Sequence, residues 1–322
     1  MGKSLGLLLK TSPYLVMRTV AYLIFGLGSL VYFGVIGGIT AGLAALFKDA
    51  AAIPIIIAIV GLGGFVGIWK LIERLVFFAI KAGHVAVITE LLTKGSLPPG
   101  VNQVEFGKQA ITNHFGTMAA YAAVDALVEG AVRQVLGWLT AAAEFLAFIP
   151  GIRTIWGFVR QVLSVAGNYI DEAVLSYTLA HPGQSAWKSG ADGVVLYAQA
   201  WKQLIVTALV VVIVIFVIWL IGALPFFAVG TLAAGAMLPV DAKDSSWIIG
   251  LIAGAIGGGI VRAIFADPIA MVMMVTAYHD AVREMTPQVD LYGKLSGVSN
   301  KFRELNEKAQ QPVPAPAYGA AR

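Results

Sequence analysis

The stretch that decides the fold is Leu204–Leu238, which reads LIVTALVVVIVIFVIWLIGALPFFAVGTLAAGAML. It contains no charged residue and is longer than the roughly 20 apolar residues that carry an α-helix across a bilayer. Pro225 interrupts it, so we expect a kink or a break in the helix there. The stretch therefore predicts an all-α, polytopic helical membrane protein.

Three further segments satisfy the same requirement: Thr19–Phe47, Ala51–Trp69 and Trp247–Ala266. The composition agrees, because 58% of the 322 residues are hydrophobic and 12% are charged, against roughly 25% charged residues in a soluble domain. Asp267 and Pro268 are expected to end the last segment, with Asp267 as a cap and Pro268 opening a new helix. Four spans leave no room for a soluble catalytic domain of ordinary size.

The distribution of lysine and arginine predicts the orientation of the spans. Basic residues precede the first span, follow the second and follow the fourth: Lys3, Lys10, Arg18, Lys70, Arg74, Lys81, Arg283, Lys294, Lys301 and Arg303. Since basic loops stay in the cytoplasm, we expect a multi-pass protein of the cell (inner) membrane with both termini cytoplasmic and both hairpin loops outside.

The predicted organisation is a single membrane domain over residues 1–284, followed by two short segments. Its parts are a hairpin at 19–69, an amphipathic helix at 70–94, a polar-striped hairpin at 106–180, a hairpin at 204–266 and a helix at 268–284. Residues 285–308 are predicted to be a short cytoplasmic segment, and the Pro- and Ala-rich residues 309–322 a disordered tail. In the helix at 70–94, a polar stripe ending at Lys81 and His84 predicts a position along the cytoplasmic membrane interface.

The central hairpin carries the candidate functional residues. Its polar stripes contain Asp125, Glu129, Arg133, Arg160, Asn168, Asp171 and Glu172. If the two helices pack antiparallel, Arg133 can pair with Asp171 or Glu172, and Arg160 with Asp125 or Glu129. Two interpretations remain open. Either the hairpin adds two spans, six in total, and its charges line a substrate path, or it lies at the cytoplasmic surface and the charges face water.

Arg262 is a second candidate, because it lies one turn from the cytoplasmic end of the fourth span with Asp267 five residues later. Its side chain either extends to the interface or forms a buried pair with a carboxylate of the central hairpin.

Glycines at four-residue spacing lie on one face of two spans, Gly34, Gly38 and Gly42 on the first and Gly250, Gly254 and Gly258 on the fourth. Such faces allow close helix packing, either within the chain or between copies of it. The two hairpins also share an order of long span, short loop, second span and histidine-bearing helix. This similarity indicates either an internal repeat, as in many transporters, or the general likeness of Gly-rich membrane hairpins.

Several kinds of chemistry are not expected. The chain has no cysteine, and its four histidines show no metal-ligand spacing. It contains no GxxxxGK[ST] phosphate loop, no HExxH and no GxSxG, and its net charge of +4 is small. We therefore expect no enzymatic activity, no cofactor, no metal and no nucleic-acid partner. The expected partners are the lipid bilayer and either further copies of the chain or a membrane-protein complex.

About forty residues, GNYIDEAVLSYTLAHPGQSAWKSGADGVVLYAQAWKQLI, resemble a region of choline transporter-like membrane proteins. The matching positions are Asn168, Tyr169, Ile170, Lys188, Ser189, Asp192, Gly193 and Leu196. The spacing between the two parts is longer than in that family, and the large extracellular loop of its eukaryotic members is absent. The patterns at Lys81–Leu91 and Pro99–Lys108 are similar to those of uncharacterised bacterial multi-span proteins, which implies a family but no activity.

Two functional hypotheses follow. In the first, the protein is a small-solute transporter or channel-like protein, and the acidic residues of the central hairpin suit a cationic substrate or a coupling proton. In the second, it is a non-catalytic membrane scaffold or an accessory subunit of a larger complex. The second hypothesis rests on the glycine faces and on SNKFRELNEKA, a short amphipathic helix that Ser299 would cap and that would dock a partner. It predicts that removal of the residues after Pro287 breaks the complex and leaves the membrane domain intact.

Overall fold

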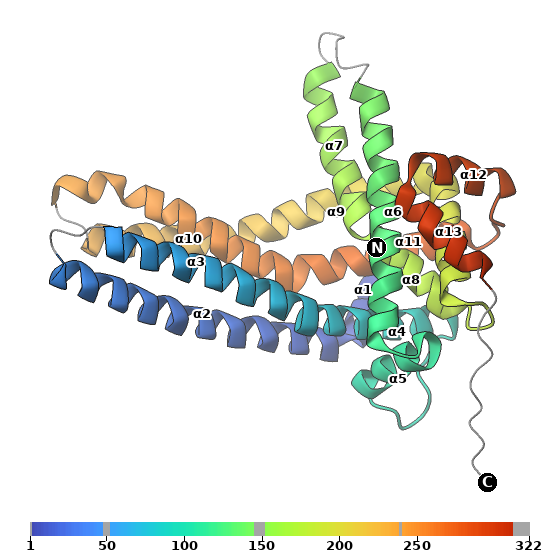
Figure 1. Cartoon of the computed structure of the whole chain (residues 1–322), viewed down its shortest axis with the longest axis horizontal. Helices are drawn as coiled ribbons and strands as arrows, with labels where there is room; N and C mark the ends of the chain where they lie inside the picture. The colour runs from blue at the N-terminus through green and yellow to red at the C-terminus, as the bar shows by residue number, and fades with distance from the viewer. Residues whose placement is uncertain (1, 48–51, 145–151, 238–239, 312–322) are drawn as a thin grey trace.

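A computed structural model describes residues 2–47, 52–144, 152–237 and 240–311, and this part of the chain folds into helices without a β-strand (Figure 1). The helices are α1 (Gly2–Lys10), α2 (Ser12–Leu46), α3 (Ala52–Ile72), α4 (Phe78–Thr93), α5 (Gln103–Phe115), α6 (Met118–Glu144), α7 (Ile152–Asn168), α8 (Ile170–Ala180), α9 (Ala186–Met237), α10 (Ser246–Val261), α11 (Asp267–Val282), α12 (Val289–Val298) and α13 (Asn300–Gln310). Two π-helical turns, η1 (Glu73–Phe77) and η4 (Arg262–Ala266), and one 3₁₀ turn, η3 (Val240–Ser245), complete the described elements.

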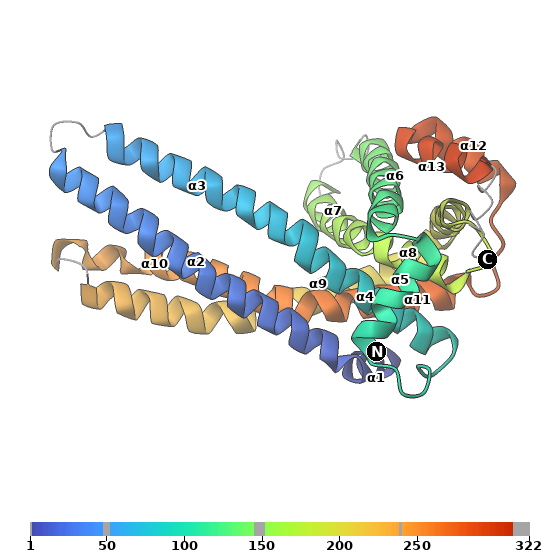
Figure 2. The same ribbon diagram turned by 60° about the horizontal axis from the view of Figure 1, so that its bottom comes forward.

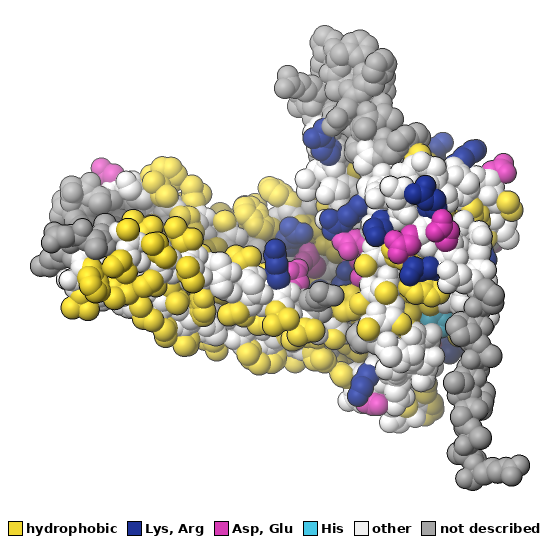
Figure 3. Space-filling model, in the orientation of Figure 1, with side chains coloured by type: hydrophobic (Ala, Val, Ile, Leu, Met, Phe, Trp, Pro, Cys, Tyr) yellow, Lys and Arg dark blue, Asp and Glu magenta, His cyan; other side chains and the backbone are white. Residues whose placement is uncertain are grey.

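Two hairpins of long apolar helices extend side by side from a compact group of shorter helices (Figures 1 and 2). We call α2, α3, α10 and the second half of α9 the stalk, and the remaining helices the head. Apolar side chains cover the stalk, whereas lysine, arginine, aspartate and glutamate gather on the head (Figure 3). In the described residues, four helical segments are long and apolar enough to cross a membrane, and each overlaps one of the four predicted spans over nearly its whole length.

A fifth candidate arises only if α5 and α6, which are bent by 78° relative to each other, count as one segment. Figure 1 places both helices in the head, so we treat them as outside the membrane-spanning segments. The central hairpin of α6 and α7 projects crosswise to the stalk, and its connection lies outside the described residues. Whether this hairpin enters the membrane stays a prediction.

Both hairpins leave the head in the same direction, and α1 and α13 lie at the head end (Figure 1). The first and last described helices, α1 and α13, therefore lie at the same end of the stalk. Which side is cytoplasmic stays a prediction.

The two glycine faces predicted on α2 and α10 differ in what they contact. A Cβ added at Gly254 would lie 3.0 Å from the Ala223 carbonyl oxygen, and one added at Gly258 would lie 2.9 Å from the Trp219 carbonyl oxygen. The glycine face of α10 thus packs against α9, as close helix approach requires. The prediction of packing within the chain does not hold for α2, because a Cβ added at Gly34, Gly38 or Gly42 would meet no described atom within 4 Å.

The predicted breaks in the long helices differ from those observed. α9 continues through Pro225 without a break, although the proline ring supplies no N–H to the helix. At the end of the fourth span, Pro268 does lie in the first turn of α11. Asp267 does not cap that helix, because the chain enters it through the π-helical turn η4 and no open N-terminus remains to be capped.

α4 forms part of the core of the head. The prediction that residues 70–94 lie along the membrane interface as an amphipathic helix is wrong for this half, because nearly every residue from Ile80 to Thr89 is buried. Lys81 and His84 point into the head rather than toward water, since partners from α8 and from the start of α2 receive them. A polar stripe on a helix therefore predicts an exposed face only if no other helix supplies hydrogen-bonding or charged partners for it.

The C-terminal helices also belong to the head. Ser299 caps α13 as predicted, its hydroxyl accepting a hydrogen bond of 3.0 Å from the Phe302 N–H. Phe302 and Leu305 are fully buried against α6 and α9, so the apolar face of α13 is not available to dock a partner. The hypothesis that SNKFRELNEKA offers a free apolar face to a partner is therefore wrong, and removal of the residues after Pro287 would expose the core of the head.

Candidate functional site

The central feature of the head is a lysine, its side chain 27% exposed, that faces two adjacent buried acids. Lys81 of α4 places its Nζ 3.0 Å from Asp171 Oδ2 and 2.6 Å from Glu172 Oε1. Asp171 and Glu172 occupy the first turn of α8, where the helix dipole favours negative charge. Their side chains are only 6% and 4% exposed, so the ion pairs lie where solvent screens them little.

A third acid, Asp125 of α6, lies beside this group. It is one turn after the buried Tyr121, and its Oδ1 is buried without a hydrogen-bond partner in the described structure. Asp171 Oδ1 and Glu172 Oε2 are also buried and lack partners. A buried acceptor without a partner costs about 1–3 kcal/mol. Binding a proton at one of these oxygens lowers that cost, so this arrangement favours protonation of the acids. We call Lys81, Asp125, Asp171 and Glu172 the buried acid cluster.

The acids of this cluster differ in their affinity for protons. Burial raises the pKa of Glu172 well above its usual value, and the charge of Asp171 adds to that effect. Burial also acts to raise the pKa of Asp171, but Lys81 and hydrogen bonds outweigh it and hold this pKa below its usual value. Burial, followed by the charge of Asp171, raises the pKa of Asp125 to about 7. At neutral pH these shifts leave Asp171 as the most readily ionised acid beside Lys81, and Asp125, with a pKa of about 7, poised between its two forms.

The structure brings together only part of the predicted stripe. Asp125, Asp171 and Glu172 meet, but Lys81 takes the place that the antiparallel pairing gave to Arg133. Glu129 and Arg133 pair with each other on an exposed face of α6, one helical turn apart. Arg160 and Asn168 are exposed on α7.

Sequence reasoning missed Lys81 as a member of this site. The signal for it was present, because Lys81 and His84 are the polar exceptions in the otherwise apolar run VFFAIKAGHVAVI at 76–88. A lysine in such surroundings requires a carboxylate partner, and here the partner lies 90 residues later in the chain.

Arg262 and Asp267 form a smaller group where the stalk joins the head. Arg262 Nε lies 3.3 Å from Asp267 Oδ1, and the Tyr169 hydroxyl donates a hydrogen bond of 2.8 Å to the same oxygen. The Arg262 side chain is 43% exposed, and its carboxylate partner comes from its own helical run rather than from the central hairpin. The alternative of a buried pair with the hairpin is therefore not formed.

The two hairpins make matching hydrogen bonds in the head. His84 Nε2, after the first hairpin, lies 2.8 Å from Thr11 Oγ1, just before that hairpin. His279 Nε2, after the second, lies 2.7 Å from Ser176 Oγ, on the helix before it. Each hairpin is thus closed at its base by a bond between a histidine and a hydroxyl group.

The two hairpins also contact each other at their bases, where the helix before each hairpin packs on the helix after the other. α1, before the first hairpin, packs on α11, after the second, and α8, before the second hairpin, packs on α4, after the first. An ion pair joins each contact, Lys3 with Asp280 at 3.0 Å in one and Lys81 with Asp171 in the other. These contacts agree with an internal repeat whose two copies point in the same direction.

Within the described residues, no group of three or more histidine, aspartate or glutamate side chains is arranged to hold a metal ion. Comparison of the chain with family models, with curated proteins and with solved structures gives no match. The resemblance to choline transporter-like proteins and to bacterial multi-span proteins therefore stays a prediction. The chain's apolar helices are compatible with an integral membrane protein, and any function beyond this is a proposal.

Proposed function

We propose that this protein is a non-catalytic membrane assembly protein whose helix α2 receives an apolar transmembrane helix from outside the chain. The observation that carries the proposal is the unfilled glycine face of α2, where Gly34, Gly38 and Gly42 meet no described atom. The equivalent face of α10 is filled by α9. Glycines at this spacing allow two helix backbones to approach closely, and such a face has little value against lipid alone.

The surroundings of this face support the proposal. None of the most apolar stretch of α2 is buried within the chain, although α2 is as long as a span requires. On the other side of the helix, Tyr32 and Ile36 contact α3, so the glycine face points away from the chain's own hairpin partner. A helix from outside the chain would cover this face in the same way that α9 covers α10.

The absence of cysteine from the chain allows a direct test. Gly38→Cys places a thiol on the open face of α2, and Ile252→Cys places one on an exposed, lipid-facing position of α10 as a matched control. Thiol-specific crosslinking in native membranes should trap a second chain through Gly38→Cys and give little product with Ile252→Cys. A dimer would identify the outside helix as another copy, and a heterologous adduct would identify an accessory role. Equal crosslinking of the two variants, or none, contradicts the proposal.

A second candidate function, proton-linked transport, is favoured by the buried acid cluster. An acid poised near pH 7 beside a partly buried lysine suits a proton that is taken up and released during a transport cycle. The stalk contributes no charged residue to this cluster, since Lys81 lies on α4 of the head, so the solute path would have to reach the head. Proton movement into proteoliposomes, followed with an enclosed pH-sensitive dye, should be abolished by Asp125→Asn and unchanged by the half-buried Glu129→Gln. Equal proton movement in the Asp125→Asn and Glu129→Gln variants would show that the buried acid cluster takes no part in proton transport.

A further inference from the structure

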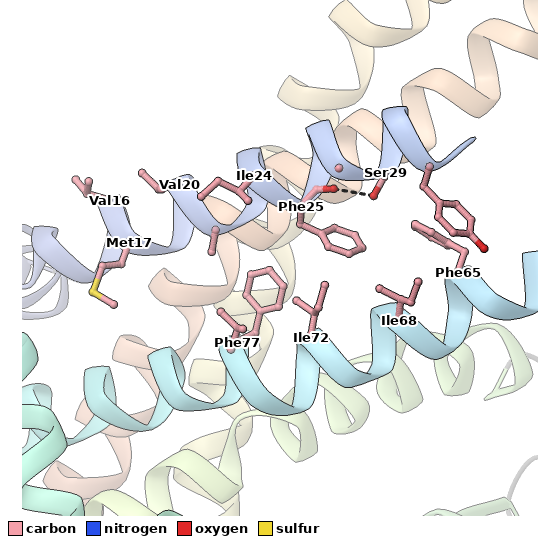
Figure 4. Close-up of a pocket in the computed structure, with 14 residues that line it drawn as sticks. Val16, Met17, Val20, Ile24, Phe25, Ser29, Phe65, Ile68, Ile72 and Phe77 are labelled. Carbon is pink, nitrogen blue, oxygen red and sulfur yellow. Dashed lines mark hydrogen bonds between the residues drawn. The ribbon is translucent and has the colours of Figure 1, made fainter. Parts of the chain in front are cut away.

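A long apolar groove runs between α2 and α3 from the head toward the middle of the stalk (Figure 4). Its volume is about 700 Å³. It is lined by residues of α2 between Val16 and Tyr32, by residues of α3 between Phe65 and Ile72, and by Val76 and Phe77 of η1. Figure 4 shows side chains from the two helices pointing toward each other across it.

The walls of this groove offer no free polar group. The Ser29 hydroxyl donates to the Phe25 carbonyl oxygen at 2.7 Å, and the Tyr32 hydroxyl donates to the Gly61 carbonyl oxygen at 2.8 Å. A polar ligand would find no partner along the groove, so its occupant must be a hydrocarbon.

The groove is also too narrow for a helix. Its two walls are joined by stacking of Tyr22 on Phe77, with ring centroids 4.3 Å apart, and by an edge contact of Phe25 with Trp69 at 4.6 Å. An α-helix with its side chains is about 10 Å wide and would have to break these contacts. A single extended hydrocarbon chain requires no such opening.

The groove is longer than one leaflet is thick, so it can hold the full length of an acyl chain in that leaflet. From Val16 to Tyr32 it extends about 24 Å at 1.5 Å per residue, and one leaflet contributes about half of the roughly 30 Å hydrocarbon core. The predicted first span begins at Thr19, so the head end of the groove lies at the expected level of the lipid headgroups.

A buried cation without a partner lies at that end. Arg18 follows the groove-lining Met17, is only 9% exposed, and has a buried Nη1 without a hydrogen-bond partner in the described structure. Its charge acts on Tyr22, whose ring stacks on Phe77 at the end of the groove. The nearby carboxylates do not neutralise it, because Asp267 is held by Arg262 and Tyr169, and the exposed Glu73 makes no ion pair within the described residues. A guanidinium in this position favours a phosphate oxygen as its partner.

We propose that the groove between α2 and α3 binds one acyl chain of an anionic phospholipid, with the lipid phosphate paired to Arg18. The acyl chain fills the apolar groove, and the phosphate satisfies the guanidinium that the chain itself leaves without a partner. The site uses a different face of α2 from Gly34, Gly38 and Gly42, so it does not depend on the assembly function.

Native mass spectrometry of the purified protein, after exchange into mixed micelles with phosphatidylglycerol or with phosphatidylcholine of the same acyl chains, tests the proposal. The native protein should retain one phosphatidylglycerol molecule about tenfold more strongly than phosphatidylcholine, because both lipids carry a phosphate but the choline cation of phosphatidylcholine already neutralises its own. Arg18→Gln should remove this preference, and Arg18→Lys should keep most of it.

Two glycine variants separate the groove from general lipid contact. Gly28→Phe fills the groove from α2 without a backbone clash, because a Cβ at Gly28 meets no atom within 4 Å, and it should abolish retention of both lipids. Gly26→Phe, on the same helix but outside the groove, has the same open surroundings and should retain lipid as the native protein does. Equal retention of the two lipids by the native protein, or undiminished retention by Gly28→Phe, would overturn the proposal.

Discussion

The two hairpins of the stalk have the same build and differ in how completely they are packed. In α9 and α10 the backbones approach closely along the glycine face of α10, and Gly254 and Gly258 touch carbonyl oxygens of α9. In α2 and α3 a groove separates the walls, and the glycine face of α2 touches nothing in the described chain. The α9–α10 hairpin is the more closely packed of the two, although a cavity of about 490 Å³ remains between Trp219, Phe227 and Leu251. The α2–α3 hairpin is therefore the one for which we propose contacts with other molecules.

The largest expected difference between the hairpins concerns their glycines. Gly254→Leu should lower the free energy of unfolding by about 3 kcal/mol or more, because its side chain would have to displace Phe227 and the backbone at Ala223. Gly38→Leu should change the unfolding free energy of the detergent-solubilised monomer by less than about 0.5 kcal/mol. Thermal unfolding in detergent measures both, and a Gly38→Leu monomer as unstable as Gly254→Leu would contradict the difference in packing.

The next largest effect on stability is expected from the ion pairs that join the bases of the two hairpins. Lys81→Met leaves buried Asp171 and Glu172 without their cation and should cost about 3 kcal/mol of folding stability. Lys3→Met removes the pair at the other contact, where both side chains are about half exposed, and should have an effect below about 1 kcal/mol. Chemical denaturation of the two variants side by side distinguishes the contacts, and equal effects would show that the two are equivalent in energy as well as in position.

A smaller effect should depend on pH. The pKa of Asp125 in the folded protein, about 7, lies above its ordinary value, so the folded state binds the proton more tightly than the unfolded state does. This contribution to stability is complete below the ordinary pKa and is lost as the pH rises through about 7. Asp125→Asn keeps a neutral side chain, so at pH 8 it should be more stable than the native protein by about 1–3 kcal/mol, with little difference at pH 4.

The control is Glu129→Gln, a half-buried position on the same helix whose charge is the smallest of the influences on the pKa of Asp125, so this variant should shift the native curve only slightly between pH 4 and pH 8. Unfolding temperatures measured across this range provide the test. A native curve that rises between pH 5 and pH 8 relative to that of Asp125→Asn would show that Asp125 is ionised in the folded protein.

The smallest effect should test whether the hairpins are equivalent. Thr11→Val and Ser176→Ala each remove the hydroxyl group that bonds the histidine of one hairpin, and each should cost about 1 kcal/mol. Ser176 also lies 2.7 Å from Thr89 Oγ1, so its loss should be the slightly larger one. Stability measured by the same denaturation experiment would contradict an internal repeat if only one of the two variants differed from the native protein.

The stalk could be predicted from the sequence, because the cost of placing charge in a membrane makes each span visible as a local run of apolar residues. The glycine face of α10 and the cap at Ser299 are also local patterns, and the structure confirms both. The head could not be predicted in the same way. From the sequence, Lys81 is predicted to face solvent and α13 to be free. Both predictions fail because the fold places Asp171 and Glu172 beside Lys81 and packs Phe302 against α6 and α9.

The position of α13 has a consequence for the order in which the molecule is made. Phe302 and Leu305 fill the core of the head and are among the last residues of the described chain to leave the ribosome. All four candidate spans are synthesised before them, so each can enter the membrane while the head is still incomplete. We therefore expect the spans of the nascent protein to insert before the head is complete. Until α13 docks, the apolar surfaces of α6 and α9 that it covers are accessible to chaperones and proteases.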